Sequence, residues 1–312
     1  MYIVSMTTIP SRLHMLEVNL ESLLNQSYQF DKLVINIDDN ISKEDLEKYE
    51  KLKAVSSKIE LNQCESKWRS CNKLLPTLQR YPNDVIITVD DDVYYPDKCI
   101  EELVKHYELL PTPQKIIIAH EINPIFIKQQ ENYVGYYNTW DYKFKQVEYG
   151  KYLSNCCLFP PHVFDGTMLF DYEKMMKYTN GLHDELWFWL CSTLNGIQCI
   201  GLNYIQSFEG EVKVKYEEGD FTLGSINGQA NVIKDYMDKI SKDFGEQLIG
   251  QIKSKPTLFT ITKDNIYAIL AFQDNLKQLY NYGFQIQFDK DLTSYWRKYF
   301  LNNWKNNYSL FI

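Results

Sequence analysis

The feature of this 312-residue sequence that most restricts its fold is the regular alternation of short apolar runs with segments of helical spacing. After a run at Tyr2–Thr7, leucines recur from Leu13 to Leu24 at the spacing of an amphipathic helix. Further apolar runs, separated by helix-like segments, lie at 32–37, 58–62 and 85–89. Strands that alternate with helices in this way form a mostly parallel sheet covered by helices on both faces. The sequence therefore predicts an α/β fold.

The remaining pattern is less regular, but it still predicts several elements. We expect helices from Ser70 to Leu78 and from Asp97 to Leu109, and a third over Asp184–Leu194 that Asn195–Gly196 ends. Strands are expected at 115–119 and 197–205, a loop at the tyrosine-rich stretch 133–149, and an apolar segment at 152–159.

Polar clusters stand where three of the predicted strands end. Thr7–Thr8 closes the first strand, Asp38–Asp39 the second, and Asp90, Asp91 and Asp92 the fourth. Parallel sheets bind their ligands outside the carboxyl ends of the strands. We therefore expect these three clusters to meet on one edge of the sheet and to form a binding site.

The three adjacent carboxylates after Val85–Val89 require a positive partner, because mutual repulsion makes it costly to ionise all three. In an extended segment Asp90 and Asp92 point the same way and Asp91 points the other way. Two such carboxylates, together with substrate phosphates, are a typical environment for Mg²⁺ or Mn²⁺. The alternative is a solvated acidic turn that follows an edge strand.

A second acidic pair, Asp184 and Glu185, opens the predicted aromatic helix. Acidic residues are favoured in the first turn of a helix, which is one sufficient explanation. The functional alternative is that one carboxylate is a general base for a substrate hydroxyl, with Trp187 or Trp189 as a stacking surface. His183, directly before the pair, is a candidate ligand for a metal or for the substrate.

The composition and charge of the chain restrict which ligands it can bind and in which cellular compartment it is expected. A net charge of -8 and a pI near 5.3 argue against nucleic-acid binding and favour a small-molecule ligand. Seven cysteines without paired C-x-x-C spacing suggest reduced core thiols. The N-terminal residues do not read as a secretory signal and no run is long enough to span a membrane, so we expect a cytoplasmic protein.

Beyond about Gly210 the pattern predicts a mainly helical extension, with helices at 226–240, 265–280 and 292–305. We therefore divide the chain into domains at 1–210 and 211–312. The last helix interleaves aromatic residues such as Trp296 with basic ones such as Arg297, which suits peripheral contact with an anionic membrane. A helix docked on the core, or an oligomer contact, explains the same pattern.

The motifs "SMTTIPSRL", "NKLLPTL", "VIITVDDDVYYP" and "HDELWFWLCSTLNG", in this order, resemble the GT-A fold glycosyltransferases of family 2 over residues 1–210. The resemblance implies a GT-A fold and the transfer of a sugar from a nucleoside diphosphate sugar, with a UDP-sugar favoured. It implies Mn²⁺ or Mg²⁺ as cofactor. It also implies a glycan or lipid-linked acceptor in the synthesis of a bacterial surface polysaccharide or lipooligosaccharide.

The resemblance assigns roles to particular residues. Asp38 or Asp39 matches the acid that contacts the nucleobase or ribose, with Thr7 and Asp91 on the same donor-binding edge. Asp90 matches the residue near the ribose, and Asp92, with Asp90, the metal ligand. The acidic pair stands before Gly196, and Glu185, eleven residues ahead of it, takes the position of the base. The family usually has Asp there, so Asp184 stays an alternative.

Two cationic and one imidazole side chain complete the predicted site. Arg69 and Lys73 are four residues apart, which places them on one face of a helix, where either could neutralise a diphosphate. Surface ion pairs are the alternative for both. The segment 152–162 matches the acceptor side of the family, which makes His162 a candidate acceptor contact.

Two other functions are alternatives to sugar transfer. A phosphatase of the haloacid dehalogenase type also places D-x-D after an apolar strand, but its motif requires Thr or Val two places after the second Asp, where this chain has Tyr94. A non-catalytic domain that binds a nucleotide or glycan and organises an assembly is the second alternative.

Overall fold

The structure is a computed structural model of the whole chain. It describes residues 1–109, 116–136, 150–152, 156–203, 212–213, 231–254, 259–261 and 286–288. The predicted helices at 265–280 and 292–305, and the aromatic and basic segment around Trp296, lie outside the described residues.

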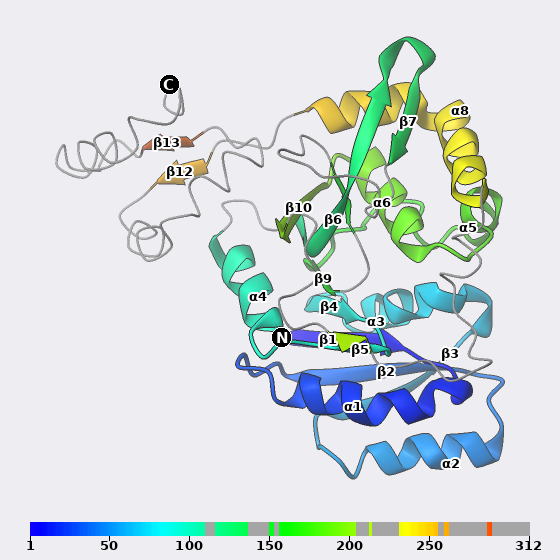
Figure 1. Cartoon of the computed structure of the whole chain (residues 1–312), viewed down its shortest axis with the longest axis vertical. Coiled ribbons are helices and arrows are strands. Elements are labelled where there is room, and N and C mark those ends of the chain that lie inside the picture. Colours follow the sequence, from blue (N-terminus) through cyan, green and yellow to red (C-terminus); the bar gives the residue numbers. More distant parts are fainter. Residues whose placement is uncertain are drawn as a thin grey trace.

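A central sheet of nine strands organises the molecule, in the order β10-β6-β9-β4-β1-β2-β3, with β7 and β8 added to β6 (Figure 1). The first four strands are parallel neighbours and confirm the prediction: β1 (Tyr2–Thr7), β2 (Lys32–Asp38), β3 (Ile59–Cys64) and β4 (Val85–Val89). Their carboxyl ends therefore share one edge of the sheet.

The other half of the sheet is mixed. Strand β9 (Cys156–Phe159) runs antiparallel between β4 and β6 (Ile116–Lys128), and β10 (Gln198–Asn203) is parallel to β6. The predicted strand at 115–119 was too short, because β6 extends to pair with β7 (Tyr133–Tyr136) and β8 (Gly150–Tyr152). The stretch predicted as a loop thus begins with a strand.

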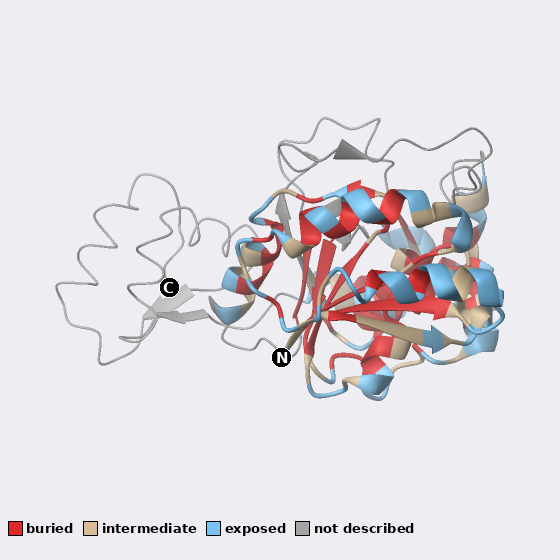
Figure 2. Cartoon of the chain, turned by 90° about the horizontal axis from the view of Figure 1, so that it is seen from below, coloured by how far each residue is buried: buried red, intermediate tan, exposed pale blue. Residues whose placement is uncertain are grey.

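Helices cover both faces of the sheet, as predicted, and each face has its own core (Figure 2). One core packs α1 (Leu13–Leu24), α2 (Lys43–Leu52) and α4 (Cys99–Leu109) against residues such as Val4 and Met6 of β1. The other packs α3 (Leu75–Arg80), α5 (Tyr172–Thr179), α6 (Asp184–Leu194) and α8 (Val232–Lys253) against residues such as Ile3. Successive residues of β1 point to opposite faces, so both sides of the strand are apolar.

The connection between β3 and α3 differs from the prediction. Instead of one helix over 70–78, a 3-10 helix, η2 (Ser66–Lys73), precedes α3, and Arg69 inside η2 has the non-helical angles φ 51° and ψ −126°. A second 3-10 helix, η1 (Pro10–Arg12), lies between β1 and α1.

The part of the chain after residue 210 contains both helix and strand. Helix α8 begins at Val232 and ends at Lys253, later at both ends than the predicted 226–240. Short strands also occur: β11 (Val212–Lys213) pairs with β5 (Val93–Tyr94), and β12 (Phe259–Ile261) with β13 (Ile286–Phe288). The described residues after 210 are therefore mainly helical, as predicted, with short strands in addition, and the domain boundary at 210 stays a prediction.

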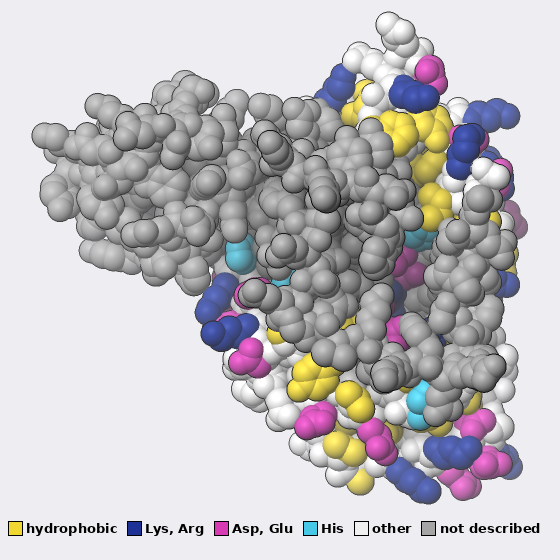
Figure 3. All heavy atoms as spheres, in the orientation of Figure 1, with side chains coloured by type: hydrophobic (Ala, Val, Ile, Leu, Met, Phe, Trp, Pro, Cys, Tyr) yellow, Lys and Arg dark blue, Asp and Glu magenta, His cyan; other side chains and the backbone are white. Residues whose placement is uncertain are grey.

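Three further observations bear on the chemistry of the chain. All seven cysteines are free thiols, and five of them are buried. Among the helices that the structure describes, none combines the length and apolar character needed to cross a membrane. On the face seen in Figure 3, acidic and basic side chains are interspersed over the part of the molecule that holds α1 and α2.

Candidate active site

The parallel pairing of β4, β1 and β2 brings the predicted polar clusters to one edge. Thr88 of β4 lies beside Ser5 of β1, so the turn that starts at Asp90 emerges next to the end of β1. The end of β2 is the next neighbour. The convergence expected from the sequence is therefore present, and it places Asp90 near the middle of the edge.

Lys73 supplies the positive charge that the carboxylates require. It is the last residue of η2, and its Nζ donates to Asp90 Oδ1 at 2.9 Å and lies 2.7 Å from Asp184 Oδ2. Its side chain is only 7% exposed. Burial alone would lower the pKa of Lys73, but the carboxylates of Asp184, Asp90 and Glu185 outweigh burial and raise it well above its ordinary value.

Asp90 is the most strongly perturbed carboxyl of this edge. Burial raises its pKa to about 7; Lys73 opposes this shift, and the charges of Asp92 and Asp184 add to it. Its backbone N–H donates to the Tyr95 hydroxyl at 2.8 Å, and Asn19 Nδ2 donates to its carbonyl at 2.9 Å. These bonds fix the turn that presents the D-x-D carboxylates.

Asp91 faces the opposite way, as the alternation of an extended chain predicted. Its Oδ1 accepts a hydrogen bond from Arg12 Nη1 at 2.7 Å, and the residue is 3% exposed. Burial raises the pKa of Asp91, against the opposing effect of Arg12. Its prediction as a donor-binding residue was wrong, because it anchors the turn to η1 beneath the edge.

The acidic pair at the start of α6 joins the same cluster, but its members differ in accessibility. Asp184 is buried against Lys73, whereas the Glu185 side chain is 19% exposed and its Oε2 lies 2.7 Å from His183 Nδ1. His183 occupies the N-cap position without a capping side-chain bond. Glu185 is thus the carboxylate that a substrate can approach, with its orientation set by His183.

The end of β2 presents a third polar group. Asp38 accepts a hydrogen bond from Asn72 Nδ2 at 3.2 Å, and burial raises its pKa. Asp39 is exposed, and its Oδ1 accepts from the Ser66 N–H at 3.3 Å. At the end of β1, Thr7 Oγ1 donates to the Asn36 carbonyl at 3.0 Å.

The prediction that Arg69 and Lys73 share a helix face was wrong. The backbone turns at Arg69, so the i, i+4 relation of a continuous helix does not apply. Its guanidinium donates instead to the Asn180 carbonyl at 3.3 Å. Lys73 lies among the carboxylates, and Arg69 lies outside them.

Trp187 was also wrongly predicted as a substrate contact. It is 0% exposed, and its Nε1 donates to the Leu169 carbonyl at 3.0 Å. Trp189 is 2% exposed in the same core. Both rings are enclosed in this core, so neither is accessible for stacking on a ligand.

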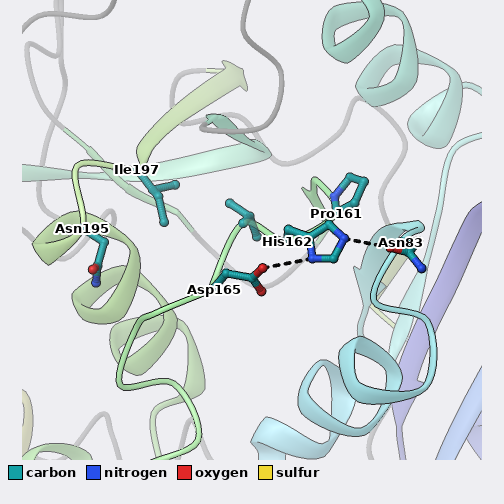
Figure 4. Close-up of a pocket in the computed structure, with 7 residues that line it drawn as sticks. Asn83, Pro161, His162, Asp165, Asn195 and Ile197 are labelled. Atoms are coloured by element: carbon teal, nitrogen blue, oxygen red, sulfur yellow. Dashed lines mark hydrogen bonds and ion pairs between the residues drawn. The ribbon is translucent and has the colours of Figure 1, made fainter.

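His162 lies at the opposite edge of the sheet, so its prediction as an acceptor contact was wrong. Strand β9 is antiparallel to β4, so the residues after Phe159 lie near the start of β4. There His162 Nε2 is 2.8 Å from Asn83 Oδ1, and Nδ1 is 3.0 Å from Asp165 Oδ2 (Figure 4). These residues line a hollow of about 530 Å³ that is remote from the carboxylates. The prediction failed because it did not include the direction of β9.

With this geometry in place, comparison with known proteins decides the family. Residues 8–164, half of the chain, match the sequence model of Glycosyl transferase family 2. The chain belongs to glycosyl transferase family 2. A search of curated proteins finds no significant match. The family membership leaves the phosphatase alternative without support.

Solved structures similar to this family 2 chain share only low sequence identity with it. The mannosyltransferase PcManGT from Pyrobaculum calidifontis, solved with GDP-Man and Mn²⁺, is 13% identical (TM-score 0.49), with 90% of this chain and 72% of that chain covered. A 2-C-methyl-D-erythritol 4-phosphate cytidylyltransferase from Francisella tularensis is 16% identical (TM-score 0.40; coverage 73% and 98%). Mouse xyloside xylosyltransferase 1 is 14% identical (TM-score 0.36; coverage 65% and 84%).

The donor groups of this family 2 site fit a hard divalent cation held mainly by its substrate. Asp90 and Asp92 are close enough for the charge of Asp92 to raise the pKa of Asp90. Within the described ranges, no group of three or more His, Cys, Asp or Glu side chains could hold a metal. Mg²⁺ commonly takes one or two carboxylates and completes its shell with phosphates and water. The aspartates fit that mode.

Sequence reasoning missed the residues that hold Lys73 in place. Ser5 Oγ donates to the Lys73 carbonyl at 2.7 Å and lies 2.6 Å from Thr77 Oγ1. Asn36 Nδ2 donates to the Ser5 hydroxyl, the Met6 carbonyl and the Thr77 hydroxyl at 3.0–3.1 Å. All three side chains are buried. An asparagine and a serine inside apolar strands were the available signal, since buried polar groups require partners.

Proposed function

We propose that this family 2 glycosyltransferase moves a sugar, of the hexose type, from a nucleoside diphosphate sugar to a hydroxyl of a glycan or lipid-linked acceptor. A UDP-sugar is the favoured donor, and a bacterial surface polysaccharide or lipooligosaccharide the favoured product. One observation carries the proposal: Asp90, Asp184 and Glu185, from two distant segments, surround Lys73 at the sheet edge where the D-x-D turn emerges.

Each group of the edge has a role that follows from its position. Asp92, with Asp90, would hold Mn²⁺ or Mg²⁺, which stabilises the charge of the departing diphosphate. Asp38, half-buried at the end of β2, would contact the nucleoside; its position at the same edge supports this role. Lys73 holds Asp90 and Asp184 in position through its ion pairs, and its contact with the diphosphate stays a prediction.

The transfer itself requires a base for the acceptor proton. As the acceptor oxygen bonds to the anomeric carbon, the bond from that carbon to the diphosphate oxygen breaks, and the hydroxyl proton passes to Glu185. Glu185 is preferred over Asp184 because it is more exposed and is oriented by His183. This route applies to transfer with inversion at the anomeric carbon.

Ligand binding tests the donor part of the proposal. UDP, GDP and CDP are titrated with and without Mn²⁺ while the melting temperature is followed. A ligand at 100 times its Kd stabilises the folded state by about 2.7 kcal/mol. We expect one nucleotide to stabilise the protein only with metal, and Asp92→Ala to abolish the effect. Asp97→Ala, an exposed acid beyond the same turn, is the matched control.

Turnover tests the catalytic part. Glu185→Gln is expected to keep nucleotide-dependent stabilisation and to lose transfer by about 10²–10⁴-fold. No stabilisation by any nucleotide, with or without metal, would refute the proposal. Stabilisation by a nucleotide without turnover of any donor would instead identify a non-catalytic binding domain.

A further inference from the structure

Three aromatic side chains, Trp68 in η2 and Phe170 and Tyr172 before and at the start of α5, form one cluster that we call the aromatic surface. Trp68 is half-buried against the core, and the other two side chains are exposed. The Trp68 ring lies edge-on to Phe170 at 6.4 Å and 90°, and to Tyr172 at 5.6 Å and 87°, measured between ring centroids. Phe170 is 42% exposed and Tyr172 38%. Contiguous exposed apolar groups with a polar rim are typical of binding sites.

The segment η2 links the aromatic surface to the candidate active site. It contacts the chain between Phe170 and the first residue of α6 at three successive points. Trp68 contacts Phe170 and Tyr172, Arg69 donates to the Asn180 carbonyl, and Lys73 pairs with Asp184. Since Lys73 and Asp184 belong to the carboxylate cluster, a molecule that extends from the catalytic edge along η2 reaches the aromatic surface.

Backbone strain in η2 supports a binding role. Arg69 has φ 51° and ψ −126°, a conformation that favours glycine, and it directly follows Trp68. Non-glycine residues in such conformations cost of order 1–3 kcal/mol and cluster at ligand sites. Its guanidinium donates to the Asn180 carbonyl at 3.3 Å, and because this hydrogen bond is long and exposed it compensates little of the strain.

The rim of the aromatic surface carries charges of both signs. Lys67 Nζ lies 5.3 Å from the Trp68 ring centroid and 5.9 Å from that of Tyr172, and it pairs with Glu65. Asp171 pairs with Lys174 at the start of α5. Mixed charges do not favour an anionic membrane, and an acyl chain gains nothing from them. They suit a ligand with one apolar face and hydroxyls at its edge.

We propose that the aromatic surface binds a pyranose unit of the acceptor glycan. The C–H groups on one face of such a ring pack on aromatic side chains, and its hydroxyls reach the charged rim. This inference rests on the proposed function and adds the acceptor class to it: the acceptor is a saccharide of more than one unit, because one unit sits on the aromatic surface while another presents its hydroxyl to Glu185.

Saturation-transfer NMR tests the proposal with defined probes: methyl β-D-glucopyranoside, methyl β-D-galactopyranoside, cellobiose and lactose. We expect ring C–H signals from at least one probe with the wild-type chain, and about a tenfold loss of affinity in Trp68→Ala and, as a milder exposed change, in Tyr172→Ala. Tyr28→Ala is the matched control, since Tyr28 forms an edge-on pair with Tyr2 (5.3 Å, 78°) at the start of β1 and thus at the opposite edge.

The outcomes separate this proposal from the function on which it rests. Binding of no probe, or unchanged binding in Trp68→Ala and Tyr172→Ala, overturns the aromatic surface as a sugar site. Loss of nucleotide-dependent thermal stabilisation in these variants overturns it too, because the surface would then serve the donor. Failure of the proposed function appears separately, as a wild-type chain that no nucleotide stabilises.

Discussion

At the scale of single residues, the run Asp90, Asp91 and Asp92 is tolerated because the three carboxylates do not share one environment. Asp90 pairs with Lys73, and Asp91 pairs with Arg12 on the other side of the turn. Asp92 is half-buried beside Asp90. Lys73 balances Asp184 as well, so removing its charge would leave the buried carboxylate of Asp184 and the half-buried one of Asp90 without this partner; breaking a buried pair typically costs about 3–5 kcal/mol.

Asp90 makes the stability of the metal-free protein depend on pH. Its pKa is about 7 in the folded chain and about 4 when unfolded, so the folded state binds the proton more tightly between these values. The contribution of Asp90 to stability is therefore full below pH 4 and is lost as the pH rises through 7. Asp90→Asn, which keeps a neutral side chain, should gain stability relative to wild type between pH 5 and pH 8.

Thermal melts without divalent cations at pH 5, 6, 7 and 8 measure this difference. Asp97→Asn, an exposed acid in the same connection, should show no such trend. A difference between Asp90→Asn and wild type that stays constant over this range would contradict the assignment of the raised pKa to Asp90.

At the scale of elements, η2 places both Lys73 and Trp68, and its strained residue offers a direct test. Arg69→Gly removes the penalty of the positive φ and should raise the free energy of unfolding by about 1 kcal/mol. Asn180 also has a positive φ of 51°, at the C-cap of α5, but Asn tolerates that conformation. Asn180→Gly should therefore gain no more than a few tenths of a kcal/mol from the backbone, and it loses the hydrogen bond between the Asn180 side chain and Tyr236, which contributes about 1 kcal/mol.

Urea denaturation of both variants provides the comparison. An Arg69→Gly chain that is less stable than wild type would show that the side chain of Arg69, and not strain, dominates at this position. The aromatic surface predicts in addition that the more stable glycine variant binds saccharides more weakly, since Trp68 loses its fixed neighbour.

Elements were predictable where local signals define them. Gly196 at φ 69° follows the end of α6 at the position expected from sequence. Ser42, a residue type favoured at helix N-caps, caps α2 by accepting from the Asp45 N–H at 3.1 Å. The backbone of η2 leaves the helical conformation at Arg69, although no glycine or proline stands there to indicate it. The length of β6 and the direction of β9 depend on pairing with distant strands, which local pattern does not contain.

The same distinction applies to the site. The acids Asp38, Asp90, Asp184 and Glu185 could be found because they stand at strand ends or open a helix. Lys73 could be predicted as a site residue, but its position among these acids could not, because its contact with Asp184 joins segments more than a hundred residues apart. Trp187 and His162 were misplaced because neither the buried face of α6 nor the orientation of β9 follows from residue type.

At the scale of the whole molecule, α8 belongs to the same core as the catalytic half, although it lies beyond the family match. Its buried residues Tyr236, Ile240 and Leu248 share a cluster with Trp187 and Ile3. Ser241 Oγ accepts from the Val134 N–H at 3.0 Å and so ties α8 to β7. Burial of several large side chains contributes on the order of 10 kcal/mol, comparable to the whole stability of a domain.

Two glycines of α8 test this packing with a matched pair of substitutions. A Cβ on Gly245 would overlap the carbonyl of Asn132, whereas a Cβ on Gly250 would meet nothing within 4 Å. Alanine is the better helix former by up to about 1 kcal/mol, so Gly250→Ala should stabilise the protein. Gly245→Ala should instead destabilise it by about 1–3 kcal/mol, because α8 must move away from β7. Urea denaturation decides, and equal stabilisation by both substitutions would show that α8 does not pack against Asn132.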